Sequence, residues 1–112
     1  MSNLESVRKF EFRPCRMKAG FDVTFLAGGE TVHGICRDVS DAGVRAQFDG
    51  PVVTGSAGQI TLRHPSGIVN LEAQVAYSEK SQVGLVFLFR TPSECASVTR
   101  LIAAIANDDV AL

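Results

Sequence analysis

The sequence predicts a small all-β domain, either a sandwich or a barrel, followed by one helix. Apolar and polar residues alternate in several short segments, as they do in half-buried strands. Turns rich in Gly, Pro, Asp and Ser separate these segments, at a spacing that fits a sandwich or barrel better than alternating strands and helices. From residue 92 the apolar residues instead recur with the period of a helix.

The predicted strands lie between residues 21 and 89. They cover residues 21–26, 31–37, 43–48, 59–63, 68–77 and 82–89. The segment 82–89 is almost continuously apolar, so we expect it to be covered on both faces. In 68–77, Tyr77 falls on the same parity as the apolar residues. One shared core is expected from Val23, Phe25, Val44, Phe48, Ile60, Leu62, Val75, Leu85 and Phe87, with Leu101 and Ile105 beside it.

The final helix has a clear start signal. Thr91 precedes Pro92 and lies three residues before Glu94, which is a capping box with proline at the first helical position. Asp108 and Asp109 would lie at the negative end of the helix dipole, so we expect the helix to end near residue 107.

Composition excludes several classes of protein. The chain has 112 residues, of which 46% are hydrophobic and 21% are charged, as is usual for one folded domain. Its net charge of −1 gives no general attraction for nucleic acid, and most of its phenylalanines have apolar neighbours. The three cysteines form no disulfide or zinc pattern. Without an apolar span or a signal-peptide core, we expect a cytoplasmic protein that does not insert into membranes.

Catalysis and metal binding have little support in the sequence. Neither His33 nor His64 has a nucleophile or a carboxylate at a recognisable spacing, so we expect no enzyme activity. His33 and Cys36 fall on opposite parities of one predicted strand and would face opposite sides of the sheet. We therefore expect no metal site and no catalytic residues.

The turn between the second and third predicted strands is a candidate binding site. Asp38 and Ser40 can turn side-chain oxygens onto nearby backbone N–H groups, and Gly43 can adopt a positive φ. The same residue types also form ordinary turns, so spacing alone does not assign a ligand.

A basic cluster near the N-terminus is the second candidate. It consists of Arg8, Lys9, Arg13 and Arg16. Arginine stays charged, donates two parallel hydrogen bonds to a phosphate and stacks on aromatic bases. Pro14 disfavours a helix here, so we expect an arm that becomes ordered when an anion binds. A solvated, mobile terminus is the simpler alternative.

Taken together, the D-x-S-x-x-G string of residues 38–43, the basic cluster upstream, the strand at 83–87 and the terminal helix resemble the PilZ domain family. The resemblance extends from about Arg8 to Ile105. It implies a six-stranded antiparallel β-barrel with a C-terminal helix. It also implies binding of cyclic di-GMP (c-di-GMP), with no other cofactor, and ligand contacts from Arg8, Lys9, Arg13, Arg16, Asp38, Ser40 and Gly43.

The chain departs from the family in its RxxxR motif. Lys9 and Arg13 have the family spacing, but lysine replaces the first arginine; Arg8 and Arg13 are both arginine, but four residues separate them. Lysine lacks both the forked donors and the stacking plane, so binding through Lys9 would be weaker by about 1–3 kcal/mol. The sequence leaves both pairings open.

The resemblance implies a c-di-GMP receptor or adaptor that signals to an effector protein. We expect an N-terminal arm over residues 1–20, a barrel with its helix over 21–107 and a tail over 108–112. The alternative is a PilZ-like domain that binds no nucleotide and acts only through protein contacts. A nucleic-acid polymer is not an expected partner, and a homodimer remains open.

Overall fold

A computed structural model describes residues 17–80 and 82–111, with side chains described as far as Asn107. All six predicted strands and the predicted helix are present. The elements are β1 (Met17–Lys18), β2 (Asp22–Ala27), β3 (Glu30–Val39), β4 (Gly43–Phe48), β5 (Ala57–His64), β6 (Gly67–Glu79), β7 (Gln82–Leu88) and α2 (Pro92–Ala111).

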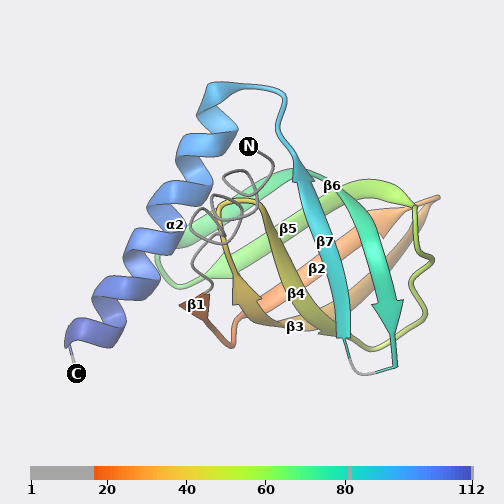
Figure 1. The fold of residues 1–112 in the computed structure, drawn as a ribbon, viewed down its shortest axis with the longest axis horizontal. Helices are drawn as coiled ribbons and strands as arrows, with labels where there is room; N and C mark the ends of the chain where they lie inside the picture. The colour runs from red at the N-terminus through yellow and green to blue at the C-terminus, as the bar shows by residue number, and fades with distance from the viewer. Residues whose placement is uncertain (1–16, 81, 112) are drawn as a thin grey trace, which may run out of the picture.

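The six strands β2 to β7 close into an antiparallel barrel, as expected (Figure 1). Their order around the barrel is β3, β2, β5, β6, β7 and β4, and pairing of β3 with β4 completes the circle. The hairpin from β2 to β3 turns through Gly28 and Gly29, whose φ values of 62° and 81° favour glycine. Closure leaves no long unpaired strand edge among the six.

The barrel interior forms the core, and the predicted core residues are confirmed. Phe48 is half-buried, while eight others are buried: Val23, Phe25, Val44, Ile60, Leu62, Val75, Leu85 and Phe87. Burial of each large apolar side chain contributes about 1.5–3 kcal/mol. These residues therefore fix which face of each strand points inward.

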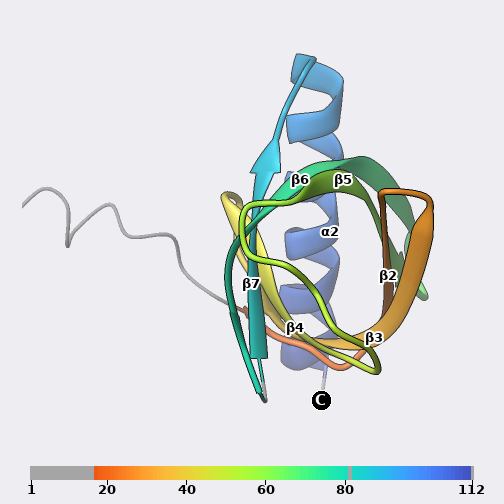
Figure 2. The same cartoon turned by 90° about the vertical axis from the view of Figure 1, so that its right-hand side faces the viewer.

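Helix α2 lies across one end of the barrel, behind the ring of strands in Figure 2. Val98, Leu101 and Ile105 are buried on its inner face. At its start, Thr91 Oγ1 accepts a hydrogen bond from the Glu94 N–H at 3.2 Å, as the capping box predicts. The Glu94 carboxylate reaches one residue further than expected and accepts from the N–H of Arg90 at 2.7 Å.

Three expectations about boundaries and coverage are corrected. Met17–Lys18 forms β1, so part of the expected arm is a strand that pairs with β3. Helix α2 continues to Ala111, where a tail was expected, because a helix-dipole penalty of about 0.3–1 kcal/mol is too small to end a helix. Strand β7 is not covered on both faces, since Val86 points outward and is 46% exposed.

In the described part of the chain, no helix is both long and apolar enough to cross a membrane.

Candidate functional site

A row of residues crosses five strands on the outer face of the barrel. The row is defined by strand register: Lys18 pairs with Asp38, Asp38 with Arg45, Arg45 with Gly84, and Gly84 with Tyr77. We call these five residues the polar row. It brings together side chains from β1, β3, β4 and β6, with a glycine of β7 between them.

Two irregularities in strand pairing build the polar row. Between Cys36 and Asp38 the register of β3 shifts against β4, and between Val75 and Tyr77 the register of β6 shifts against β7. Each shift adds one residue to its strand, as a β-bulge does. The added residue turns Asp38 and Tyr77 toward the outer face, beside Arg45. The expectation that Tyr77 shares the inward parity of its strand is therefore wrong.

Asp38 and Arg45 form an ion pair at the centre of the row. The Nε of Arg45 donates to Oδ1 of Asp38 at 2.9 Å, and the two side chains are 38% and 15% exposed, respectively. This hydrogen bond to the carboxylate raises the pKa of Arg45 and outweighs the lowering that burial causes, with a smaller contribution from Tyr77 nearby. Arg45 therefore stays positively charged at every physiological pH.

Tyr77 lies over Gly84 of the neighbouring strand. A Cβ built at Gly84 would overlap the ring of Tyr77, so only glycine leaves room for the ring there. The Tyr77 hydroxyl also accepts a hydrogen bond from Nε2 of Gln82 at 2.8 Å. The ring of Tyr77 therefore packs against Gly84, and its hydroxyl is bound by Gln82. The side chain as a whole is partly exposed.

The turn from β3 to β4 is tighter than the sequence suggests. β3 continues through Val39, so Asp38 lies on the strand rather than in the turn. Ser40 is fully buried, and its Oγ accepts a hydrogen bond from the N–H of Ala42 at 3.2 Å. The predicted role of Ser40 in satisfying the turn backbone is confirmed.

Gly43 is required for a reason other than the expected positive φ. It is not among the glycines with positive φ. Instead, a Cβ at this position would overlap the carbonyl oxygen of Leu85 and lie 3.2 Å from its carbonyl carbon. The glycine therefore allows β4 and β7 to approach each other where the barrel closes.

Comparison with known proteins identifies the family. The PilZ domain family model matches residues 6–104. The chain belongs to the PilZ domain family. No curated protein matches it.

Solved PilZ structures share the fold of this chain. The PilZ domain of YcgR from Escherichia coli, solved with c-di-GMP, aligns with a TM-score of 0.75 at 19% identity, over 87% of this chain and 92% of that one. The PilZ domain of CeSA from a cellulose-synthesizing bacterium aligns with a TM-score of 0.71 at 17% identity. This alignment covers 82% of this chain and 98% of that one. PlzA of Borreliella burgdorferi, in complex with c-di-GMP, aligns with a TM-score of 0.55 at 16% identity. This alignment covers 96% of this chain and 57% of that one. At these identities the likeness establishes the fold.

The site residues expected from the PilZ resemblance fall into two groups. Arg8, Lys9, Arg13 and Arg16 lie outside the described residues. Asp38, Ser40 and Gly43 lie together at the end of β3 and the start of β4, but in different settings. Asp38 faces outward in the polar row, whereas Ser40 and Gly43 are buried in the turn that supports it.

Sequence analysis did not single out Arg45 or Tyr77. Arg45 stands two residues after Gly43 on the polar parity of its strand, which is a signal that could have placed it beside Asp38. For Tyr77 the alternating pattern gives the opposite face, because a bulge leaves no mark in the alternation. Only the register of β6 against β7 reveals its position.

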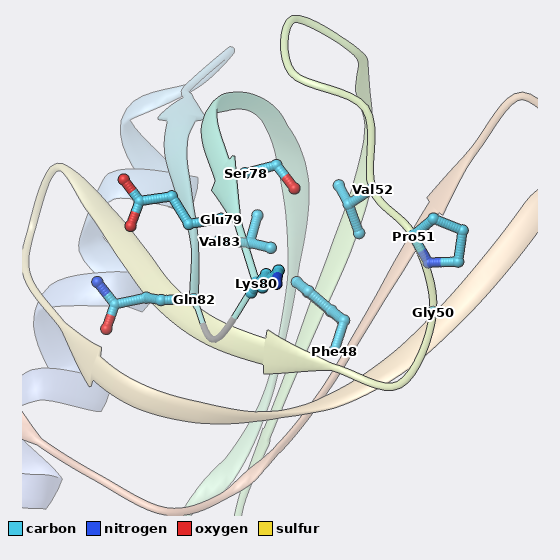
Figure 3. A pocket seen from close by; sticks show the side chains of 9 residues that line it. All are labelled: Phe48, Gly50, Pro51, Val52, Ser78, Glu79, Lys80, Gln82 and Val83. Atoms are coloured by element: carbon cyan, nitrogen blue, oxygen red, sulfur yellow. The ribbon is translucent and has the colours of Figure 1, made fainter.

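A separate hollow of about 330 Å³ lies beside the β6–β7 hairpin (Figure 3). Phe48, Val52 and Val83 line it, together with the hairpin residues Glu79 and Lys80. The two charged side chains have opposite sign and are both exposed, so the hollow has no net charge to attract an anion. The polar row is the better candidate site.

The described residues contain no group of three or more His, Cys, Asp or Glu side chains that could hold a metal ion. His33 is exposed and Cys36 is buried, so the two point to opposite sides of β3, as their parity predicts.

Proposed function

We propose that this PilZ domain is a c-di-GMP receptor or adaptor that binds the dinucleotide between the basic N-terminal segment and the polar row. The observation that carries the proposal is the position of β1. Lys18 of β1 pairs with Asp38, so the chain that follows the basic segment joins the barrel at one end of the row. The family membership and the c-di-GMP reported with YcgR and PlzA support the same ligand.

Chain length lets the basic residues reach the row. Arg13 precedes Lys18 by five residues, a distance that an extended chain can span up to about 18 Å. Arg16 is closer still. In this proposal Arg13, with Arg8 or Lys9, grips the phosphates and a guanine face, because guanidinium groups combine charge, forked donors and a stacking plane.

The polar row supplies complementary groups to a base. The Asp38 carboxylate accepts hydrogen bonds from a guanine edge, and the partly exposed ring of Tyr77 offers an aromatic surface for stacking, which typically contributes about 1–3 kcal/mol per base. Ser40 and Gly43 act by shaping the turn beneath Asp38. An effector protein would then recognise the surface of the ligand-bound domain.

Calorimetric titration of c-di-GMP into the wild-type chain and into Arg13→Ala tests the proposal. We expect binding by the wild type that weakens with added salt, since ionic contacts are screened. Arg13→Ala should abolish binding, because Arg13 belongs to both pairings in the cluster. Absence of binding by the wild type would instead support a PilZ domain that works through protein contacts alone, for which the lysine at position 9 is the specific argument.

A further inference from the structure

The end of the barrel opposite α2 is crossed by one loop. Residues 49–56 join β4 to β5 and run across this opening, in front of the ring of strands in Figure 2. We call them the mouth loop. At its start the N–H of Asp49 donates to the carbonyl oxygen of His33 at 2.8 Å, and near its end the N–H of Gly55 donates to that of Val75 at 2.8 Å. The mouth loop is therefore tied to the barrel at both ends.

The middle of the mouth loop presents apolar side chains to the outside. Val52 points inward and packs against the core, whereas Pro51 and Val53 are exposed. Val53 is 71% exposed, the highest value among the large apolar side chains that the structure describes. The N–H of Ser56 donates to the carbonyl oxygen of Val53 at 3.1 Å, which fixes the backbone beneath this side chain. The loop therefore holds an apolar group outward on an ordered backbone.

Two hollows flank the mouth loop, and they differ in charge. On the β2–β3 side a hollow of about 410 Å³ reaches the buried ring of Phe25, and Glu30 is the one charged residue among the described residues that line it. On the β6–β7 side lies the hollow of Figure 3, which Glu79 and Lys80 line. Figure 3 shows the carboxylate of Glu79 turned away from Pro51, so Lys80 is the charge nearer the loop. The loop thus has a negative group on one side and a positive group on the other.

Both of these charges are available to a partner. Glu30 and Lys80 are exposed, and within the part of the chain that the structure describes neither forms an ion pair. An apolar centre with unpaired charges of opposite sign on its two sides is complementary to itself. A two-fold axis running along the mouth loop would exchange the two sides, so that Glu30 of each copy faces Lys80 of the other. Val53 would then lie near the axis, against Val53 of the second copy.

We propose that the mouth of the barrel is a docking surface for a second copy of this chain, held by the Val53 contact and by two reciprocal Glu30–Lys80 ion pairs. The charge pattern favours a second copy, because the required cation and anion stand on the two sides of the same apolar centre in this chain itself. The loop is ordered before docking, which reduces the entropy lost on association. The surface covers only one end of a small barrel, so the dimer is weak and reversible.

The test is analytical ultracentrifugation of the full chain without c-di-GMP, from about 10 µM to about 1 mM, where weak complexes dissociate. We expect a monomer–dimer equilibrium that shifts toward the monomer with added salt, since the ion pairs are exposed. Val53→Asp should remain monomeric over the whole range, because it replaces the apolar contact at the axis with two carboxylates. Thermal melting of each variant checks that it folds.

A charge exchange tests the predicted pairing directly. Glu30→Lys and Lys80→Glu should each raise the dissociation constant of the dimer by about 5- to 30-fold, because each change turns two attractive pairs into two repulsive ones. The double variant Glu30→Lys/Lys80→Glu restores opposite charges across the axis and keeps the net charge of the wild type. Its dissociation constant should therefore return close to the wild-type value.

Ile68→Asp is the matched control for Val53→Asp. Ile68 is 65% exposed and lines a hollow beside Arg100 and Leu101 of α2, at the other end of the barrel. The substitution introduces the same carboxylate on an exposed apolar residue outside the mouth. It should leave the dissociation constant unchanged.

Three results would overturn the proposal. A wild-type chain that is monomeric at every concentration has no such docking surface. A dimer that persists unchanged in Val53→Asp is joined through another surface. A double variant that associates no better than the single variants excludes the pairing of Glu30 with Lys80, and with it the two-fold arrangement. Because these measurements contain no c-di-GMP, each of these results leaves the proposed receptor function standing.

Discussion

Replacing Gly43 with alanine should destabilise the barrel whether or not a ligand is present. The new Cβ would overlap the carbonyl oxygen of Leu85 and lie 3.2 Å from its carbon and 3.3 Å from the Cα of Val86. All three atoms belong to the backbone of β7, so no side chain can rotate away. Either β4 or β7 must move at the position where Gly43 pairs with Val86.

The expected cost follows from this crowding. Overpacking that forces a backbone shift usually costs about 1–3 kcal/mol. With an unfolding entropy of about 2.1 cal/mol/K per residue, each kcal/mol lowers the melting temperature of a chain this long by about 4 °C. Gly43→Ala should therefore melt about 4–13 °C below the wild type, as followed by circular dichroism and calorimetry.

Two other glycines serve as matched controls. A Cβ at Gly20 would meet nothing within 4 Å, so Gly20→Ala should be neutral or stabilising by up to about 1 kcal/mol. A Cβ at Gly58 would overlap the carbonyl oxygen of Leu26 on another part of the barrel, so Gly58→Ala should resemble Gly43→Ala. If Gly43→Ala melts with the wild type but loses c-di-GMP binding, Gly43 is a ligand residue and the steric argument is refuted.

Three further predictions concern the turn, the basic cluster and the helix. Ser40→Ala should lower the free energy of unfolding by about 1–3 kcal/mol in urea, because the N–H of Ala42 loses its acceptor; an unchanged midpoint would contradict this. Lys9→Arg should strengthen c-di-GMP binding by about 1–3 kcal/mol in calorimetry, and no change would place Arg8 at the first motif position. Leu101→Ala should cost about 2–5 kcal/mol in urea unfolding, and a smaller loss would mean that α2 is weakly packed on the barrel.

The alternation of apolar residues was sufficient to predict the strands and the core. Each predicted strand has one face in the barrel interior, and burial of that face decides its orientation. The capping box likewise located the start of α2, because Thr91 accepts from the N–H of Glu94, one of the backbone groups that the helix leaves unpaired. Both signals depend on residues close together in the sequence.

The composition of the polar row could not be predicted in the same way. It depends on two register shifts, at β3 against β4 and at β6 against β7, and parity counted along a strand gives the wrong face for every residue beyond such a shift. The D-x-S-x-x-G string marked the candidate site but did not distinguish the roles of its residues. Ser, Gly and Asp are the types that a tight turn needs as well as the types that a ligand needs, so only burial distinguishes Ser40 from Asp38.

If the dinucleotide binds at the polar row as proposed, the Asp38–Arg45 pair also removes an electrostatic obstacle to that binding. A carboxylate that accepts from guanine lies close to the phosphodiester charges of the same ligand. Two like charges about 7 Å apart, at an effective dielectric constant of about 20, repel each other by about 2 kcal/mol. Arg45 neutralises Asp38 at 2.9 Å, and Lys18 adds a positive charge at the next position of the row. In the proposed function the row therefore keeps its acceptor for guanine without excluding the phosphates, and Arg45 adds a guanidinium to the arginines of the basic cluster.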